Sequence, residues 1–111
     1  MAARVSKPNP RVSNGHRRRE LRRWWMRQGL PCQICGRAID YSLPSGHPWS
    51  FEVDEKIPVS RGGDPLSKSN TGPAHRECNR WKGAMTLEEA RARLARNKRV
   101  TKRFEGSGKW E

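Results

Sequence analysis

The sequence predicts a small α+β domain that is stabilised by zinc and flanked by basic helices. The chain contains two pairs of potential zinc ligands with the same spacing, Cys32-x-x-Cys35 and His75-x-x-Cys78. Strand-like and helical segments lie between and around these pairs. Only 32% of the 111 residues are hydrophobic, so a structural metal would add stability that a core of this size cannot supply alone.

The spacing of the two pairs is typical of a tetrahedral zinc site. Zinc takes four nitrogen or sulfur ligands, and a two-residue spacer lets one turn provide two of them. All three cysteines of the chain belong to these pairs, and a small odd number of cysteines near a histidine favours metal over disulfides. We therefore expect a structural Zn²⁺ on Cys32, Cys35, His75 and Cys78. Buried apolar thiols beside a surface histidine are the alternative interpretation.

The charge balance indicates a polyanionic partner. The chain has 24 lysines and arginines against 11 acidic residues, which gives a formal net charge of +13. Such an excess needs a polyanion or a strongly acidic surface to bind. No apolar segment resembles a signal peptide or reaches membrane-spanning length. Because thiols that bind metal must stay reduced, we expect a cytosolic protein without a membrane partner.

The N-terminal part is expected to contain an arm and a helix. Residues 1–15 show neither helical nor strand periodicity and predict a disordered basic arm. Residues 16–29 predict a basic helix in which arginines surround Leu21 and Trp24, and Gly29 is a plausible stop. The arginines could lie along phosphates and release counterions. A solvated helix that packs its tryptophans on the domain is the alternative, and both can hold at once.

The central region, residues 30–98, is expected to form the main domain. Residues 32–36 predict a tight zinc knuckle. Residues 51–59 alternate apolar and polar positions around Asp54 and Glu55, which predicts a half-buried strand that is interrupted near Pro58. A short returning strand is expected at residues 70–74, followed by a helix over residues 75–82.

The C-terminal part of this domain is expected to be a packing helix. Thr86-Leu87-Glu88-Glu89 is a capping-box pattern, and the helix should continue to about residue 97 with an apolar stripe that packs on the domain. Residues 99–111 predict a basic tail.

Together these motifs resemble the HNH endonuclease family over about half of the chain. The matching residues are Cys32-x-x-Cys35, the run from Val53 to Gly63, Asn70, and His75-x-x-Cys78-Asn79-Arg80-Trp81-Lys82-Gly83. The small basic form resembles HNH proteins of bacteriophages and prophages. The resemblance implies a ββα-metal (His-Me finger) fold, in which a hairpin and a helix hold a catalytic divalent ion.

The resemblance also implies roles for single residues. Asp54 and Asn79 match the ligands of the catalytic ion, for which Mg²⁺ or Mn²⁺ suits the oxygen donors. Asn70 matches the residue that orients the general base and steadies the loop. Glu55 stands where the family has its first histidine, the general base.

Three interpretations of Glu55 remain open. It can serve as the base, at a cost of roughly tenfold in rate because its reference pKa is about two units below that of histidine. It can bind the ion together with Asp54 and Asn79. The protein can also have lost activity and only bind DNA. His47, in a loop of unknown direction, is a weaker candidate for the base.

The resemblance therefore implies a metal-dependent endonuclease that hydrolyses DNA with low sequence specificity, in a phage or prophage context. Double-stranded DNA is the expected partner, a phage terminase is a further one, and no small-molecule cofactor is expected. The alternative is a non-catalytic, zinc-dependent nucleic-acid-binding module. The residues expected to contact nucleic acid are Arg18, Arg19, Arg22, Arg23, Arg61, Arg76, Arg80 and Lys82.

Overall fold

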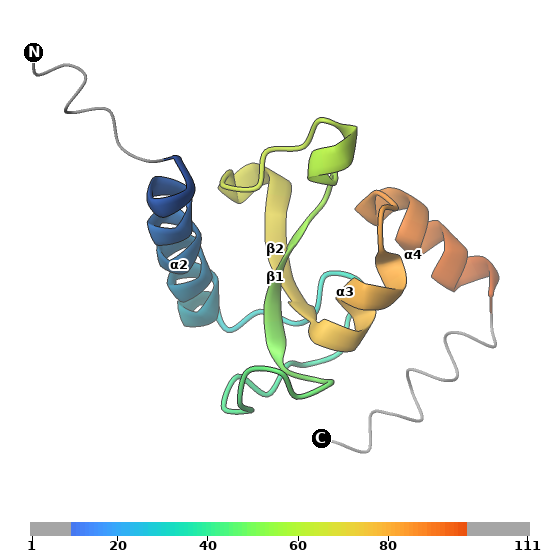
Figure 1. Ribbon diagram of the computed structural model, residues 1–111. Coiled ribbons are helices and arrows are strands. Elements are labelled where there is room, and N and C mark those ends of the chain that lie inside the picture. Colours follow the sequence, from blue (N-terminus) through green and yellow to red (C-terminus); the bar gives the residue numbers. More distant parts are fainter. Residues whose placement is uncertain (1–9, 98–111) are drawn as a thin grey trace, which may run out of the picture.

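The computed structural model describes residues 10–97, with a two-stranded hairpin at the centre and helices on both sides of it (Figure 1). The elements are α2 (Pro10–Gln28), β1 (Phe51–Glu55), the 3-10 turns η1 (Val59–Arg61) and η2 (Lys68–Asn70), β2 (Thr71–His75), α3 (Arg76–Lys82) and α4 (Leu87–Arg96). Helix α2 lies on one side of the hairpin, and α3 and α4 lie on the other. The predicted α+β class and the hairpin followed directly by a helix are confirmed.

The hairpin is antiparallel and brings the acidic run next to the buried returning strand. Asp54 pairs with Gly72, and Phe51 pairs with His75, the last residue of β2. All five residues of β2 are buried. Strand β1 is shorter than predicted and ends at Glu55. Beyond it the Ile57 N–H donates to the side chain of Asn70, and Pro58 is the N-cap residue of η1.

Helix α2 begins earlier than predicted. The structure has helix from Pro10, so the prediction of a disordered arm is wrong for residues 10–15. Proline suits the first helical position, where its missing N–H has no intrahelical partner. Extending a helix that residues 16–28 already form costs less than starting one. Residues 1–9 of the predicted arm, and the predicted basic tail, lie outside the described residues.

The core combines cysteine side chains with a small apolar cluster. Its buried members are Cys32, Ile34, Ile39, Phe51, Ala74, Cys78 and Leu87. From α2, Leu21 is buried and Trp25 donates from Nε1 to the Thr71 hydroxyl at 2.9 Å. Helix α4 begins with the predicted capping box and buries Leu87 and Ala90, so the prediction of a packing helix is confirmed.

None of the helices between residues 10 and 97 has both the length and the apolar composition that crossing a membrane requires.

Candidate metal and nucleic-acid site

The two ligand pairs meet in one buried group. The ligand atoms of Cys32, Cys35, His75 and Cys78 all lie within 4.8 Å of one another. His75 Nδ1 is 3.4 Å from Cys35 Sγ and 3.6 Å from Cys78 Sγ. Bonds of about 2.0–2.3 Å to a tetrahedral zinc would place neighbouring ligand atoms roughly 3.4–3.8 Å apart. The group therefore can hold one structural zinc ion.

Surrounding contacts orient the four ligands. His75 Nε2 lies 3.0 Å from the carbonyl oxygen of Ala38, a contact that turns Nδ1 toward the sulfur atoms. Backbone N–H groups of Cys35 and His75 donate to Cys32 Sγ at 3.5 and 3.4 Å. Gly36 closes the knuckle with a φ of 81°, a backbone conformation that favours glycine. These contacts fix the direction in which the His75 ring and the Cys32 sulfur face the other ligands.

The protonation of the group reflects its close packing. Hydrogen bonds from Cys35 and Cys78 lower the pKa of Cys32 far below its ordinary value, whereas the contact with Cys32 raises the pKa of Cys78. Burial opposes protonation of His75, but hydrogen bonds with Cys32 and Cys35 outweigh it and raise the pKa of His75 to about 9. A zinc ion that binds here must displace these protons.

The acidic end of β1 is held by two donors. Asp54 is only 2% exposed. Its Oδ1 lies 3.1 Å from Lys82 Nζ, and its Oδ2 accepts a hydrogen bond of 2.9 Å from Gln33 Nε2. Burial raises the pKa of Asp54, although the Gln33 hydrogen bond and the charge of Lys82 oppose the shift. Both carboxylate oxygens are thus fixed from inside the domain.

Lys82 corrects one expectation from the sequence. It was expected to meet phosphates at the surface, but it is 2% exposed and also donates to the Glu55 carbonyl at 2.8 Å. On α3 it lies four residues after the buried Cys78, and residues at this spacing share one face of a helix. The phosphate-binding prediction for Lys82 is therefore wrong. Arg80, on the same helix, is exposed.

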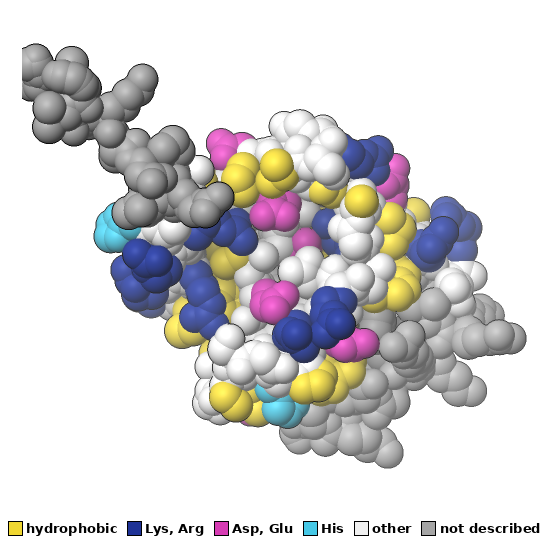
Figure 2. All heavy atoms as spheres, in the orientation of Figure 1, with side chains coloured by type: hydrophobic (Ala, Val, Ile, Leu, Met, Phe, Trp, Pro, Cys, Tyr) yellow, Lys and Arg dark blue, Asp and Glu magenta, His cyan; other side chains and the backbone are white. Residues whose placement is uncertain are grey.

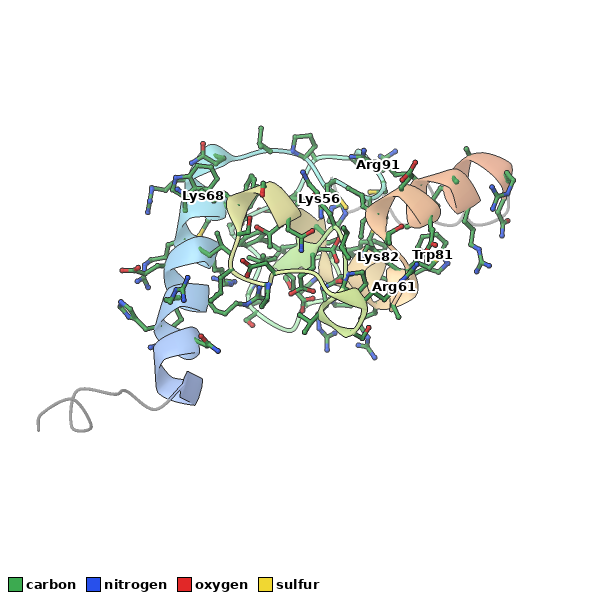
Figure 3. The ribbon with its side chains drawn as sticks, turned by 90° about the horizontal axis from the view of Figure 1, so that it is seen from above. Lys56, Arg61, Lys68, Trp81, Lys82 and Arg91 are labelled. Atoms are coloured by element: carbon green, nitrogen blue, oxygen red, sulfur yellow. The ribbon has the colours of Figure 1, made fainter. Side chains whose placement is uncertain are left out.

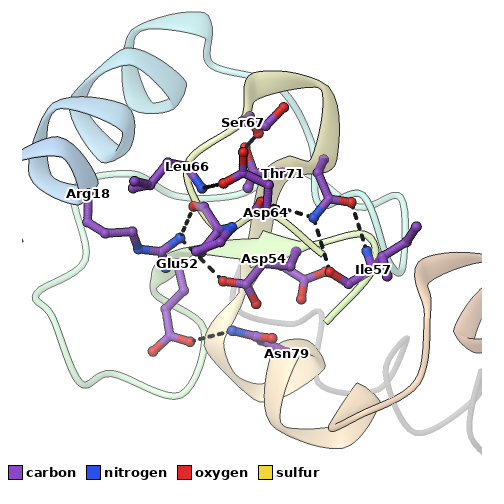
Figure 4. A network of polar contacts seen from close by, with 12 residues as sticks. Arg18, Glu52, Asp54, Ile57, Asp64, Leu66, Ser67, Thr71 and Asn79 are labelled. Carbon is purple, nitrogen blue, oxygen red and sulfur yellow. Dashed lines mark hydrogen bonds and ion pairs between the residues drawn. The ribbon is translucent and has the colours of Figure 1, made fainter. Parts of the chain in front are cut away.

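Asn79 and Glu52 form a second link between α3 and β1. Glu52 was not among the site residues predicted from the sequence. Asn79 Nδ2 donates to Glu52 Oε1 at 3.0 Å, and Glu52 Oε2 lies 3.5 Å from Arg76 Nε. Figure 4 shows Glu52, Asp54 and Asn79 gathered between β1 and α3. The signal that could have found Glu52 is the two-residue period of a strand, which places it on the same face as Asp54.

Asn70 lies where the hairpin loop closes. Its Nδ2 donates to the carbonyl oxygens of Ile57 and Asp64, each at 3.0 Å, and its Oδ1 accepts from the Ile57 N–H at 3.0 Å. The backbone at Gly63 passes so close to Ile57 that a Cβ at position 63 would overlap the Ile57 carbonyl. These contacts match the loop-steadying part of the role expected for Asn70.

Glu55 faces a different helix from Asp54. Its Oε2 is 3.3 Å from Arg18 Nη1 of α2, and its side chain is 24% exposed. Arg18 Nη1 also donates to the Pro65 carbonyl at 2.6 Å. Successive strand residues point to opposite faces, which explains why neighbouring carboxylates have different partners. His47, the weaker candidate for the base, accepts the backbone N–H of Trp49 at its Nδ1.

The arginines expected to contact nucleic acid fall into three groups. Two on α2 face the domain, since Arg18 pairs with Glu55 and the Arg22 guanidinium lies 5.1 Å from the centre of the Phe51 ring. Others are already paired within the domain: Arg61 with Glu89 at 2.7 Å, and Arg76 with Glu52. Arg19, Arg23 and Arg80 are exposed. Figure 2 shows basic side chains around a centre that contains acidic ones.

A groove rich in basic side chains lies between α2 and the segment that leads into η2. The groove has a volume of about 390 Å³ and is lined by Arg17, Glu20, Leu21, Arg23, Trp24, Arg27, Leu66 and Lys68. Lys68 Nζ lies 4.2 Å from the centre of the Trp24 ring. Figure 3 places Lys68 beside α2, with Arg61 and Lys82 on the other side of the hairpin. Lys68 was not among the residues predicted to contact nucleic acid.

Comparison with known proteins identifies the part of the chain that contains these sites. Residues 32–85 match the family model described as HNH endonuclease. The matched segment includes the four zinc ligands, both strands and α3. Neither the curated proteins nor the solved structures gave a match.

Proposed function

Because residues 32–85 form a domain of the HNH endonuclease family, we propose that the protein is a metal-dependent endonuclease that hydrolyses phosphodiester bonds of DNA. The observation that carries the proposal is the meeting of β1 and α3 beside the zinc group. There Asn79 follows Cys78 on α3, and Asp54 lies on β1, which pairs with the strand that ends at His75.

Asp54 and Asn79 would hold the catalytic divalent ion. Each oxygen of Asp54 has one donor within the domain, and a carboxylate oxygen has a further lone pair with which it could bind an ion. Asn79 donates through its nitrogen, so its Oδ1 remains an acceptor. Two oxygen ligands plus waters suit Mg²⁺ or Mn²⁺. Such an ion, when bound, stabilises charge on the phosphate and the leaving oxygen.

Of the three interpretations of Glu55, we propose the general base. Its carboxylate contacts α2, whereas that of Asp54 contacts α3, so the two do not converge as ligands of one ion would. Arg18 holds the Glu55 carboxylate in place through a contact of 3.3 Å. A carboxylate that is held in this way can take a proton from an attacking water.

We propose that basic side chains bind the phosphates of DNA and that no side chain recognises individual bases. Exposed arginines such as Arg19, Arg23 and Arg80 would meet phosphates, which carry no sequence information. Low sequence specificity follows from this kind of contact. A phage or prophage setting, with a terminase as partner, is part of the proposal, and the neighbourhood of the gene would test it.

Cleavage of supercoiled plasmid tests the proposed activity. We expect the zinc-loaded protein to nick DNA when Mg²⁺ or Mn²⁺ is added. Asn79→Ala should lower the rate by about 100-fold or more, because an ion ligand is lost. Glu55→Ala should lower it by about 10²–10⁴-fold, the usual contribution of a general base, and Glu55→His should restore part of the loss.

The control for both variants is Asp40→Asn, which removes an exposed carboxylate from a loop outside the hairpin. It should cut at the wild-type rate. Absence of nicking with any divalent ion would refute the proposed activity. In that case, salt-sensitive retention of DNA by a protein that binds one zinc and no second ion would support the non-catalytic module. An unchanged rate in Glu55→Ala would refute only the base assignment.

DNA binding should depend on the basic groove between α2 and η2. We expect Arg23→Ala and Lys68→Ala each to weaken binding and to reduce the slope of log K against log salt by about 1, since each removes one phosphate contact. Fluorescence anisotropy with a labelled duplex at several salt concentrations measures this. Arg96→Ala on α4 is the matched control, because it removes the same charge from another exposed position. An equal change in slope for Arg96→Ala would mean that only net charge matters.

A further inference from the structure

The orientation of the Asn79 side chain is fixed by Glu52. A side-chain amide has a donor end and an acceptor end, whereas an ionised carboxylate only accepts hydrogen bonds. The 3.0 Å contact between Asn79 and Glu52 Oε1 therefore requires the NH₂ group of Asn79 to face Glu52. The amide oxygen is then left for another partner.

Glu52 is itself held in place. Its Oε2 lies 3.5 Å from Arg76 Nε, at the start of α3, which leaves Oε1 for Asn79. Glu52 is paired with Ala74 in the hairpin, one residue before the zinc ligand His75. The contact thus joins β1 to α3, the helix that contains Cys78 of the zinc group.

Two contacts of this kind cross from β1 to α3. Glu52 contacts Asn79. Asp54, which lies two residues further along the strand, pairs with Lys82, which lies three residues further along the helix than Asn79. The strand repeat of two and the helix repeat of three to four residues keep each pair on facing sides. The second pair holds the Asp54 carboxylate, and the first pair holds the Asn79 amide.

We infer that Glu52 is a positioning residue that orients the Asn79 amide so that Oδ1 serves as the ligand of the catalytic cation. This inference rests on the proposed function, in which Asn79 binds that cation. Partners that orient a ligand in this way typically contribute 10–100-fold to metal affinity, as an order of magnitude.

Exchanging the carboxylate at position 52 and the amide at position 79 provides the sharpest test. Glu52→Gln keeps a side-chain oxygen that can accept from Asn79, so it should bind Mn²⁺ nearly as the wild type does. Glu52→Leu removes the acceptor and should weaken Mn²⁺ binding by about 10–100-fold. Asn79→Asp sets two carboxylates against each other and should also bind poorly. In the double variant Glu52→Gln/Asn79→Asp, the new amide can donate to the new carboxylate, and binding should recover.

Isothermal titration of zinc-loaded protein with Mn²⁺ measures these affinities. A second measurement, without Mn²⁺, follows the side-chain amide signals of Asn79 by ¹⁵N NMR. The signals should shift in Glu52→Leu and stay near their wild-type positions in Glu52→Gln. Glu88→Leu is the matched control, because it removes the same charge from an exposed position on α4. Circular dichroism checks that each variant is folded.

The outcomes separate this inference from the proposed function. If the wild type binds no Mn²⁺, the proposed cation site is refuted, and the inference falls with it. If the wild type binds Mn²⁺ and Asn79→Ala does not, but Glu52→Leu binds as the wild type does, only the positioning role is overturned. Failure of the double variant to bind better than Asn79→Asp would overturn it as well.

Discussion

Removal of zinc is expected to unfold the protein. The four ligands come from the knuckle at residues 32–35, the end of β2 and the middle of α3, and two of the cysteines belong to the core cluster. Apparent binding free energies for structural zinc reach about 10–16 kcal/mol in zinc-finger peptides. This equals or exceeds the net stability of an ordinary domain, about 5–15 kcal/mol, and the core here is small.

Far-UV circular dichroism during titration with a strong chelator measures this effect, together with the zinc that is released. The helical signal should fall as zinc leaves and return when Zn²⁺ is added back, whereas Mg²⁺ should not restore it. Cys78→Ser should fold poorly even with zinc, since Cys78 is fully buried. A chelated protein that keeps its spectrum and a cooperative unfolding transition would show that the group is not a structural metal site.

The features that the sequence predicted correctly depend on neighbouring residues. The spacing Cys32-x-x-Cys35 requires a turn, which Gly36 allows. The capping box at Thr86 and Glu89 is formed within one turn of helix. The hairpin could be predicted because the apolar residues on either side of Asp54 and Glu55 alternate. In each case the signal is a pattern of neighbouring residues, although the hairpin itself pairs residues as far apart as Phe51 and His75.

The features that the sequence did not predict depend on contacts between distant segments. Lys82 looks like any basic residue of a helix, and only the packing of α3 against β1 turns it toward Asp54. Arg18 and Arg23 have the same local setting, yet Arg18 pairs with Glu55 while Arg23 is exposed. The basic groove needs Lys68 to meet Trp24 across 44 positions of sequence, and the charge pattern does not encode that approach.

Breaking the pair between Asp54 and Lys82 is expected to destabilise the fold strongly. Lys82→Met leaves the Asp54 carboxylate buried without its cation, and removing one partner of a buried pair costs about 3–5 kcal/mol. The Glu55 carbonyl loses its donor as well, which adds to the cost because a buried acceptor is left unpaired. Urea unfolding of the zinc-saturated protein, followed by tryptophan fluorescence, measures the change in the free energy of unfolding.

A double-mutant cycle isolates the contribution of this pair. Asp54→Asn alone should also destabilise, because the Lys82 ammonium then remains buried beside a neutral group. In Asp54→Asn/Lys82→Met neither buried charge remains, so the loss should be smaller than the sum of the two single losses. The control is Arg61→Met, which breaks the exposed pair with Glu89 and should leave the unfolding midpoint almost unchanged. If Lys82→Met shifts the midpoint no more than Arg61→Met does, Lys82 and Asp54 do not form a buried pair in solution, and Lys82 becomes available again as a contact for phosphate.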